Sequence, residues 1–273
     1  MRLRIITGIV GVLLLFPVLY FTPSWGPPLA VAVLSGLAVQ ELLGTTRLVR
    51  NKRIITYGTI FAALVPVAHT FNAPGWLSIG GLFLFVFLLF AEGVTNFETV
   101  PFDAIGVTLF SGLIIPLFMM SLIRLKEMPL GNYLVLLPFV IAFCADASAY
   151  FVGRKFGKRP LAPSISPKKS VEGAVGGFAG AIICTLLFGV VISALFPVKV
   201  NYLVFMLYAL LGTFVSIMGD LSFSYIKRGV GIKDFGNVMP GHGGILDRFD
   251  SILFAAPLLE VLVMILPAIE RLV

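Results

Sequence analysis

Charged residues are scarce in this chain. Of its 273 residues, only 20 are Lys or Arg and 13 are Asp or Glu, which is 12% of the chain, against about 25% in ordinary soluble domains. Hydrophobic residues make up 59%, and residues 79–90 contain no ionisable group. This composition excludes a water-soluble enzyme and a disordered protein, and it predicts that lipid surrounds most of the chain.

Cysteine is rarer still, and the common nucleotide-binding loop is missing. The two cysteines, Cys144 and Cys184, lie in apolar stretches and form neither a CxxC pair nor a metal-binding spacing. Gly157-Lys158 is followed by Arg159 and lacks the upstream glycine of a Walker A motif, so a P-loop is excluded. Any nucleotide chemistry must use another arrangement of residues.

Breaks at proline, glycine and charged residues divide the chain into nine apolar segments. Because one crossing takes about 20 residues, the chain has room for roughly nine or ten crossings and no large extramembrane domain. We therefore predict an all-α, polytopic integral membrane protein of about nine transmembrane helices. The predicted segments are 5–21, 28–43, 54–71, 76–90, 102–123, 130–152, 173–196, 202–225 and 249–269.

The basic residues predict the orientation of these helices. With nine crossings and a cytoplasmic N-terminus, 16 of the 20 Lys and Arg residues fall on the cytoplasmic side. Such an excess is typical of cytoplasmic loops and predicts that the C-terminus lies outside. The four basic residues assigned to the other side are Arg124, Lys126, Lys199 and Arg271.

Two of the cytoplasmic loops, 153–173 and 225–249, hold ten of the twenty basic residues. The topology alone accounts for basic residues there. These loops also contain acids, serine, histidine and glycine in dense order, so we expect them to be functional.

Asp220 lies in an apolar helix just before the second loop. Ser224 and Lys227 follow it at i+4 and i+7, so the three side chains share one helix face. An ionised Asp facing lipid costs about 2.5 to 3.5 kcal/mol, so a partner is expected. We expect that partner to be a metal ion.

Asp247 and Asp250 lie at i and i+3 where the last predicted helix begins. Acids at a helix N-terminus are also explained by the helix dipole alone. The preceding stretch Pro240-Gly-His-Gly-Gly244 favours a ligand site, because glycine lets backbone amides approach an anion closely. Acids for a cation beside amides and cations for phosphates are what phosphoryl or nucleotidyl transfer requires.

The first loop offers matching groups. Asp146 lies in an apolar helix, so we expect it to face the interior. Downstream, Lys168, Lys169 and Ser170 can meet a triphosphate, and Glu172 can orient a lysine. The glycine pairs 173/177 and 176/180 that follow predict close packing of two helices.

The segment from Ser224 to Asp250 resembles the signature of the phosphatidate cytidylyltransferases, the CDP-diacylglycerol synthases. That signature reads Ser-x-aliphatic-Lys-Arg, four residues, Lys-Asp, then Pro-x-His-Gly-Gly-x-x-Asp-Arg-x-Asp, and every fixed position is matched. Met239 stands where Leu, Ile or Phe is usual. The stretches from Asp146 and from Ser166 resemble two further blocks of the family, with Ser170 in place of Thr.

The resemblance implies that CTP and phosphatidic acid condense to CDP-diacylglycerol and pyrophosphate, with Mg2+ and a second, monovalent cation such as K+. It implies a metal centre held by Asp220 and Asp247, with Asp146 and Asp250 as further candidates. The implied catalytic residues are Asp220, Lys227, Arg228, His242, Asp247 and Asp250. The residues implied to bind CTP phosphates or the lipid head group are Lys168, Lys169, Ser170, Lys233, Gly243, Gly244 and Arg248.

Within this interpretation, residues 1–125 form N-terminal transmembrane helices and residues 126–273 a C-terminal transmembrane catalytic region. His242 is expected to donate to a phosphate, because a lipid phosphate monoester is already ionised and needs no base; proton transfer is the alternative. The expected location is a bacterial inner membrane with the site facing the cytoplasm, where CTP is found. No nucleic acid partner is expected.

Three questions stay open at this point. A CTP-dependent polyprenol or dolichol kinase-like enzyme would share the nucleotide-binding logic, but would transfer the γ-phosphoryl group. A secondary transporter would also have interior acids, although the chain lacks the internal repeat typical of that class. Glu41 and Glu260 lie in or near apolar helices without catalytic context, and they pair either between helices or across a homodimer.

Overall fold

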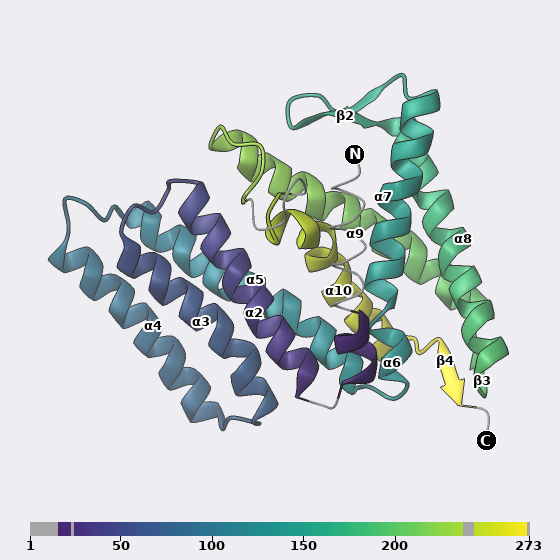
Figure 1. The fold of residues 1–273 in the computed structure, drawn as a ribbon, viewed down its shortest axis with the longest axis horizontal. Helices are drawn as coiled ribbons and strands as arrows, with labels where there is room; N and C mark the ends of the chain where they lie inside the picture. Colours follow the sequence, from purple (N-terminus) through teal and green to yellow (C-terminus); the bar gives the residue numbers. More distant parts are fainter. Residues whose placement is uncertain (1–15, 23–24, 237–242, 272–273) are drawn as a thin grey trace. The chain divides into compact units, whose positions relative to one another are not determined.

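The structure is a computed structural model that describes residues 16–22, 25–236 and 243–271 (Figure 1). Long helices dominate it, and two short antiparallel ribbons accompany them. The elements are α2 (Gly26–Thr45), α3 (Lys52–Thr70), α4 (Gly75–Thr95), α5 (Phe102–Glu127), α6 (Gly131–Leu134), α7 (Leu137–Phe156), β1 (Pro160–Ala162), β2 (Ser166–Ser170), α8 (Val171–Leu195), β3 (Val198–Val200), α9 (Tyr202–Gly229), α10 (Leu246–Ile265) and β4 (Ile269–Arg271).

The helices confirm the predicted all-α membrane architecture. Each predicted segment from 28–43 onward coincides with a helix, with α6 and α7 sharing the segment 130–152. Segment 5–21 lies mostly outside the described residues, although 16–21 are helical. Six described helical segments are long and apolar enough to cross a membrane, namely Gly26–Thr45, Gly75–Thr95, Phe102–Glu127, Gly131–Phe156, Val171–Leu195 and Tyr202–Gly229.

Side chains that directly precede several helices help to set where these helices begin. Asn51 Oδ1 accepts a hydrogen bond from the Arg53 amide at 2.8 Å before α3. Ser170 Oγ accepts from the Gly173 amide at 3.0 Å before α8, and Asn201 accepts from the first turn of α9. These contacts satisfy amides that have no partner within the helix.

The chain forms two compact units. Unit 1 comprises residues 1–123 and 227–249, and unit 2 comprises residues 124–226 and 250–273. In unit 1, α2 packs against α3, where a Cβ added at Gly58 would lie 3.0 Å from the Leu43 side chain. Phe61 of α3 stacks on Phe85 of α4, with ring centroids 4.1 Å apart. The last turn of α9 and the first turn of α10 belong to this unit.

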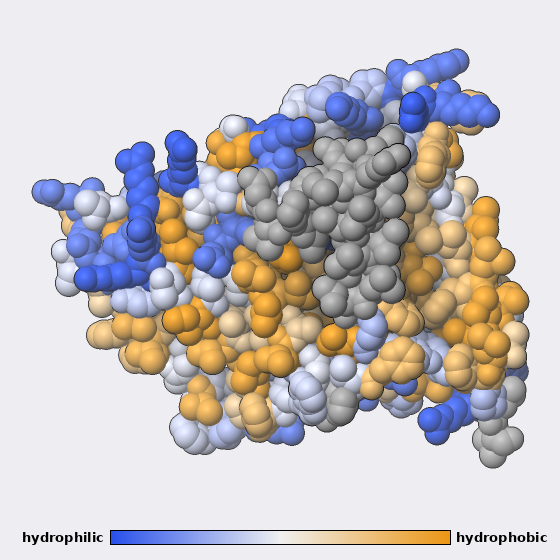
Figure 2. All heavy atoms as spheres, viewed as in Figure 1, coloured by the Kyte–Doolittle hydropathy of each residue, from blue (hydrophilic) through white to orange (hydrophobic). Residues whose placement is uncertain are grey.

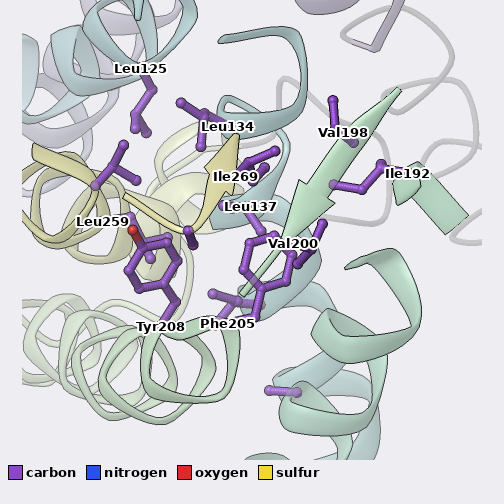
Figure 3. Packing of buried hydrophobic residues seen from close by; sticks show 14 of the residues in the cluster. Leu125, Leu134, Leu137, Ile192, Val198, Val200, Phe205, Tyr208, Leu259 and Ile269 are labelled. Carbon is purple, nitrogen blue, oxygen red and sulfur yellow. The ribbon is translucent and has the colours of Figure 1, made fainter. Parts of the chain in front are cut away.

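The core of unit 2 is apolar and lies around the ribbon β3–β4 (Figure 3). Phe205 and Tyr208 of α9 are fully buried there, with Leu259 of α10 and Val200 and Ile269 of the ribbon. Residue Val200 pairs with Ile269 in antiparallel register. The ribbon therefore ties the start of α9 to the segment that follows α10.

Helices α7 and α8 lie side by side in unit 2 (Figure 1). Gly176 and Gly180 allow this packing, since an added Cβ would lie 2.5 Å from the Val152 side chain and 1.9 Å from Ser148 Oγ, respectively. The predicted packing role of these glycines is confirmed. The first loop is shorter than expected because α7 continues to Phe156 and β1 and β2 then form a hairpin.

The surface of unit 2 changes character along α8. Figure 2 shows hydrophilic residues over the β1–β2 hairpin and hydrophobic residues over α8. Large apolar side chains of α8, such as Ile183, Leu187 and Leu195, are more than half exposed. Such a surface is expected to face lipid, with the hairpin at the aqueous side.

Candidate functional site

The first cluster of predicted site residues lies in unit 1, around the carboxylate of Asp247. Lys227 Nζ donates to Asp247 Oδ1 at 2.7 Å. The amides of Phe235 and Gly244 donate to Oδ2 at 2.8 and 3.0 Å. Lys227 and Asp247 are only 7% and 8% exposed, so this ion pair is shielded from water and the loss of either partner would leave a buried unpaired charge.

Two further groups complete this cluster. The Lys227 ammonium lies 5.3 Å from the centre of the Phe235 ring, which adds a cation–π contact. Gly243 has φ +87° and passes close to the acid, since an added Cβ would lie 2.9 Å from Asp247 Oδ2. A side chain at this position would be strained in conformation and crowded by the carboxylate.

The second cluster lies in unit 2, around Asp220 of α9. Lys169 of β2 donates to Asp220 Oδ2, and Ser224, one turn along α9, donates to Oδ1 at 3.2 Å. The side chains of Lys169 and Asp220 are 28% and 22% exposed, respectively. The described partners of Asp220 are therefore a lysine of the hairpin and a serine of its own helix, and metal binding by Asp220 stays a prediction.

The hairpin that carries Lys169 is fixed at its base. Glu172 accepts hydrogen bonds from the amides of Lys158 and Arg159 at 3.0 and 3.2 Å. Its described hydrogen bonds thus go to backbone amides, whereas the sequence predicted that it orients a lysine side chain. Ser170, expected to meet phosphate, accepts from the Gly173 amide and caps α8.

Several other predicted residues are placed differently or lie outside the described residues. Asp146 is exposed on α7, so the prediction that it faces the protein interior is wrong; periodicity cannot tell an exposed face of a helix from a buried one. Asp250 is 8% exposed and accepts from the Ser251 amide. His242 lies outside the described residues. The exposed cations among the predicted site residues are Lys168, Arg228, Lys233 and Arg248.

Side chains that could bind a metal ion are scattered over the described part of the chain. There, no three His, Cys, Asp or Glu side chains gather around a common point. Asp220 and Asp247 provide hard oxygen atoms of the kind that Mg2+ prefers. Asp220 is the more open of the two, because Asp247 already accepts three hydrogen bonds and its side chain is 3% exposed.

The sequence interpretation missed Glu41, which belongs to unit 1 with Asp247. Both Glu41 oxygens accept hydrogen bonds from backbone amides where α10 begins, those of Ile245 and Leu246, at 2.9 Å each. The sequence feature that could have indicated Glu41 is the same as for Asp220, namely an acid within an apolar helix. Glu260, the other unassigned acid, pairs with Arg124 within unit 2. Both acids therefore have partners within the chain.

Comparison with known proteins gives a family match and several relatives, two of which match nearly the whole chain. A sequence model described as the cytidylyltransferase family matches residues 2–266. The phosphatidate cytidylyltransferase of Bacillus subtilis is 32% identical over 263 residues, covering 95% of this chain and 96% of the relative. That of Thermotoga maritima is 33% identical over 280 residues, covering 99% of each. That of Pseudomonas aeruginosa is 45% identical over 142 residues, covering 52% of this chain and 51% of the relative.

The buried pair in unit 1 leads to a prediction on stability. Lys227→Met leaves a buried carboxylate without its ammonium, so we expect a loss of about 3 to 5 kcal/mol and a lower thermal midpoint in detergent. Adding Asp247→Asn is expected to recover part of the loss, because the amide oxygen still accepts from the Phe235 and Gly244 amides.

Thermal scans of the wild type, both single variants and the double variant at one scan rate give the coupling between the two residues. Lys52→Met is the control, since Lys52 is exposed in the same unit. Losses that simply add in the double variant would contradict the prediction.

Proposed function

Because the chain belongs to the cytidylyltransferase family, we propose that it is an integral membrane phosphatidate cytidylyltransferase. It condenses CTP with phosphatidic acid to give CDP-diacylglycerol and pyrophosphate. One observation carries the proposal: the family match spans both clusters, and in each cluster a lysine ammonium lies against a carboxylate. Those are the charged groups that a triphosphate and its cation need.

The reaction requires little from the protein beyond charge and position. An oxygen of the lipid phosphate attacks the α-phosphorus of CTP, a new P–O bond forms, and the bond to the β-phosphate oxygen breaks to release pyrophosphate. Both reactants are anionic, so cationic groups must lower their repulsion. The lipid phosphate is already ionised at neutral pH, and no covalent enzyme intermediate is needed.

Lysines of the two clusters are proposed to bind phosphate groups. In the structure each ammonium is neutralised by an acid, Lys169 by Asp220 and Lys227 by Asp247. A phosphate oxygen can take the place of the acid at the ammonium, and the acid is then available to a cation. The exposed Lys168 of unit 2 and the exposed Arg228, Lys233 and Arg248 of unit 1 are proposed to bind phosphate groups as well, and His242 is proposed to donate to a phosphate.

Mg2+ is the proposed cofactor, with a monovalent cation such as K+ as a second ion. Mg2+ is usually held by one or two carboxylates together with substrate phosphates, and when bound it neutralises phosphate charge. Asp220 is the favoured ligand because its side chain is partly exposed. Asp247 would have to give up its bond from Lys227 to serve as well, and Asp146 and Asp250 are the remaining candidates.

We further propose nine crossings in a bacterial inner membrane, with the N-terminus and the two functional loops in the cytoplasm. The distribution of Lys and Arg supports this orientation, and the relatives compared above are bacterial. A homodimer stays a prediction, to which the partners of Glu41 and Glu260 add no support.

The reaction type can be tested with labelled CTP. Purified protein given phosphatidic acid, Mg2+ and α-labelled CTP is expected to transfer label into the lipid, because the CMP part is transferred. Label that enters lipid only from γ-labelled CTP would favour the kinase-like alternative. No labelled lipid from phosphatidic acid would reject the proposed function, and a parallel reaction with γ-labelled CTP and a polyprenol tests the kinase-like alternative.

The metal role of Asp220 gives a second prediction. Asp220→Asn is expected to lower kcat by at least about hundredfold and to raise the Mg2+ concentration needed for half-maximal activity, because a charged ligand is lost. Asp103→Asn is the control, since Asp103 is exposed in the first turn of α5. Activity of Asp220→Asn near that of the wild type would remove Asp220 from the metal centre.

The orientation gives a third prediction, tested with two exposed lysines at opposite ends of α8. In a variant without Cys144 and Cys184, Lys199→Cys is expected to react with a membrane-impermeant thiol reagent in intact cells. Lys158→Cys is expected to react only after permeabilisation, since Lys158 belongs to a proposed cytoplasmic loop. The opposite pattern would reverse the topology.

A further inference from the structure

Glu41 is an acid of the transmembrane helix α2 whose partners belong to the loop of the family signature. It is 7% exposed and lies more than 200 positions away from those partners in the chain. Its two carboxylate oxygens accept one hydrogen bond each, Oε1 from the Ile245 amide and Oε2 from the Leu246 amide. The positive end of the α10 dipole stabilises the negative charge at this position.

The backbone on both sides of residues 237–242 is built around this carboxylate. An added Cβ would lie 2.6 Å from Glu41 Oε1 at Gly236 and 2.3 Å from Glu41 Oε2 at Gly244. Only glycine permits so close an approach at either position. Thr45, one turn further along α2, donates to the Phe235 carbonyl oxygen. Helix α2 thus holds both 235–236 and 244–246.

The same strip of backbone also binds Asp247. The Phe235 and Gly244 amides donate to Asp247, while the two amides that follow Gly244 donate to Glu41. Consecutive amides of residues 244–246 therefore donate to the two acids, the first to Asp247 and the next two to Glu41. A shift of these residues relative to Glu41 would also move the Asp247 carboxylate and change its bond from Lys227.

We propose that Glu41 is a positioning residue for CTP binding: it fixes Gly243-Gly244 and the first turn of α10, so that Asp247 and its bond from Lys227 stay in place for the nucleotide phosphates and their cation. The inference rests on the proposed function. Glu41 itself is given no contact with substrate, and phosphatidic acid binding is not expected to depend on it.

Glu41→Gln tests the hydrogen bonds of this carboxylate with little change in side-chain size. The glutamine side chain has nearly the same size, but only one terminal oxygen accepts, and its NH2 group would face an amide donor. Loss of a hydrogen bond to a charged group costs roughly 1.5 to 3 kcal/mol, and because that bond holds the segment in its binding arrangement, its loss lowers the apparent affinity by about ten- to hundredfold. Glu41→Gln is therefore expected to raise the KM for CTP at least about tenfold and to leave the KM for phosphatidic acid within about twofold.

Glu92→Gln is the matched control, because Glu92 is an equally buried acid of the same unit that accepts from Asn51 and Asn96 side chains. A second variant with its own control tests the same inference without changing Glu41 itself. Gly236→Ala is expected to displace the Glu41 carboxylate and to raise the KM for CTP. A Cβ added at Gly44 meets no atom within 4 Å, so Gly44→Ala is expected to leave the KM for CTP unchanged.

The assay measures both KM values and kcat for these four variants, with thermal midpoints in detergent. Unchanged KM for CTP in Glu41→Gln and Gly236→Ala would overturn the inference, as would a loss confined to kcat, which indicates only a smaller active fraction. A wild type that makes no CDP-diacylglycerol would instead reject the proposed function.

Discussion

The described structure depends on one constraint: an acid buried in an apolar chain must find hydrogen-bond donors or a cation. Burying a carboxylate without such partners is far more costly than any single contact in the fold is favourable. Glu41 meets the constraint with two backbone amides, Glu92 with two asparagine side chains, and Asp247 with a lysine and two amides. Each of these three sets of hydrogen bonds includes at least one that joins separate segments of the chain. The few acids therefore act as fixed points that hold helices and loops together, in a protein whose remaining contacts are mainly apolar.

The same constraint prepares the chain for anionic substrates. Lys169 and Lys227 are each placed beside an acid, so their positive charge is already neutralised and ordered within the protein. On the proposed function, a phosphate competes with the acid for the lysine, and a cation competes with the lysine for the acid. The two exchanges favour each other. A phosphate that binds the lysine frees the acid for the cation, and a cation that binds the acid frees the lysine for the phosphate. The burial of Lys227 and Asp247 makes that exchange harder than at the more exposed Asp220.

Much of the fold and part of the site follow from local patterns. Apolar runs bounded by proline, glycine and charge predicted the helices well, since a backbone in lipid must satisfy its hydrogen bonds within each segment. The spacing of Asp220 and Ser224 predicted that they share a helix face, and the glycines of α8 predicted close packing of two helices, which the structure shows to be α8 and α7. The hairpin β1–β2 was missed because its strands are only three and five residues long and carry prolines and lysines. Asp146 was assigned to the interior, because a single acid in an apolar helix has the same pattern whether it faces protein or water.

The sequence by itself determined the class of the protein, the positions of most helices and the residues with the chemistry for nucleotidyl transfer, because these depend on composition, periodicity and short spacings. Only the tertiary structure decided which groups pair. Lys227 with Asp247, Lys169 with Asp220 and Glu41 with the start of α10 are separated by 20 to more than 200 positions. A carboxylate accepts from any donor within about 3 Å, and helix packing and loop paths select that donor. Glu41 therefore had no assigned role in the sequence, and its proposed role comes only from the backbone that lies against it.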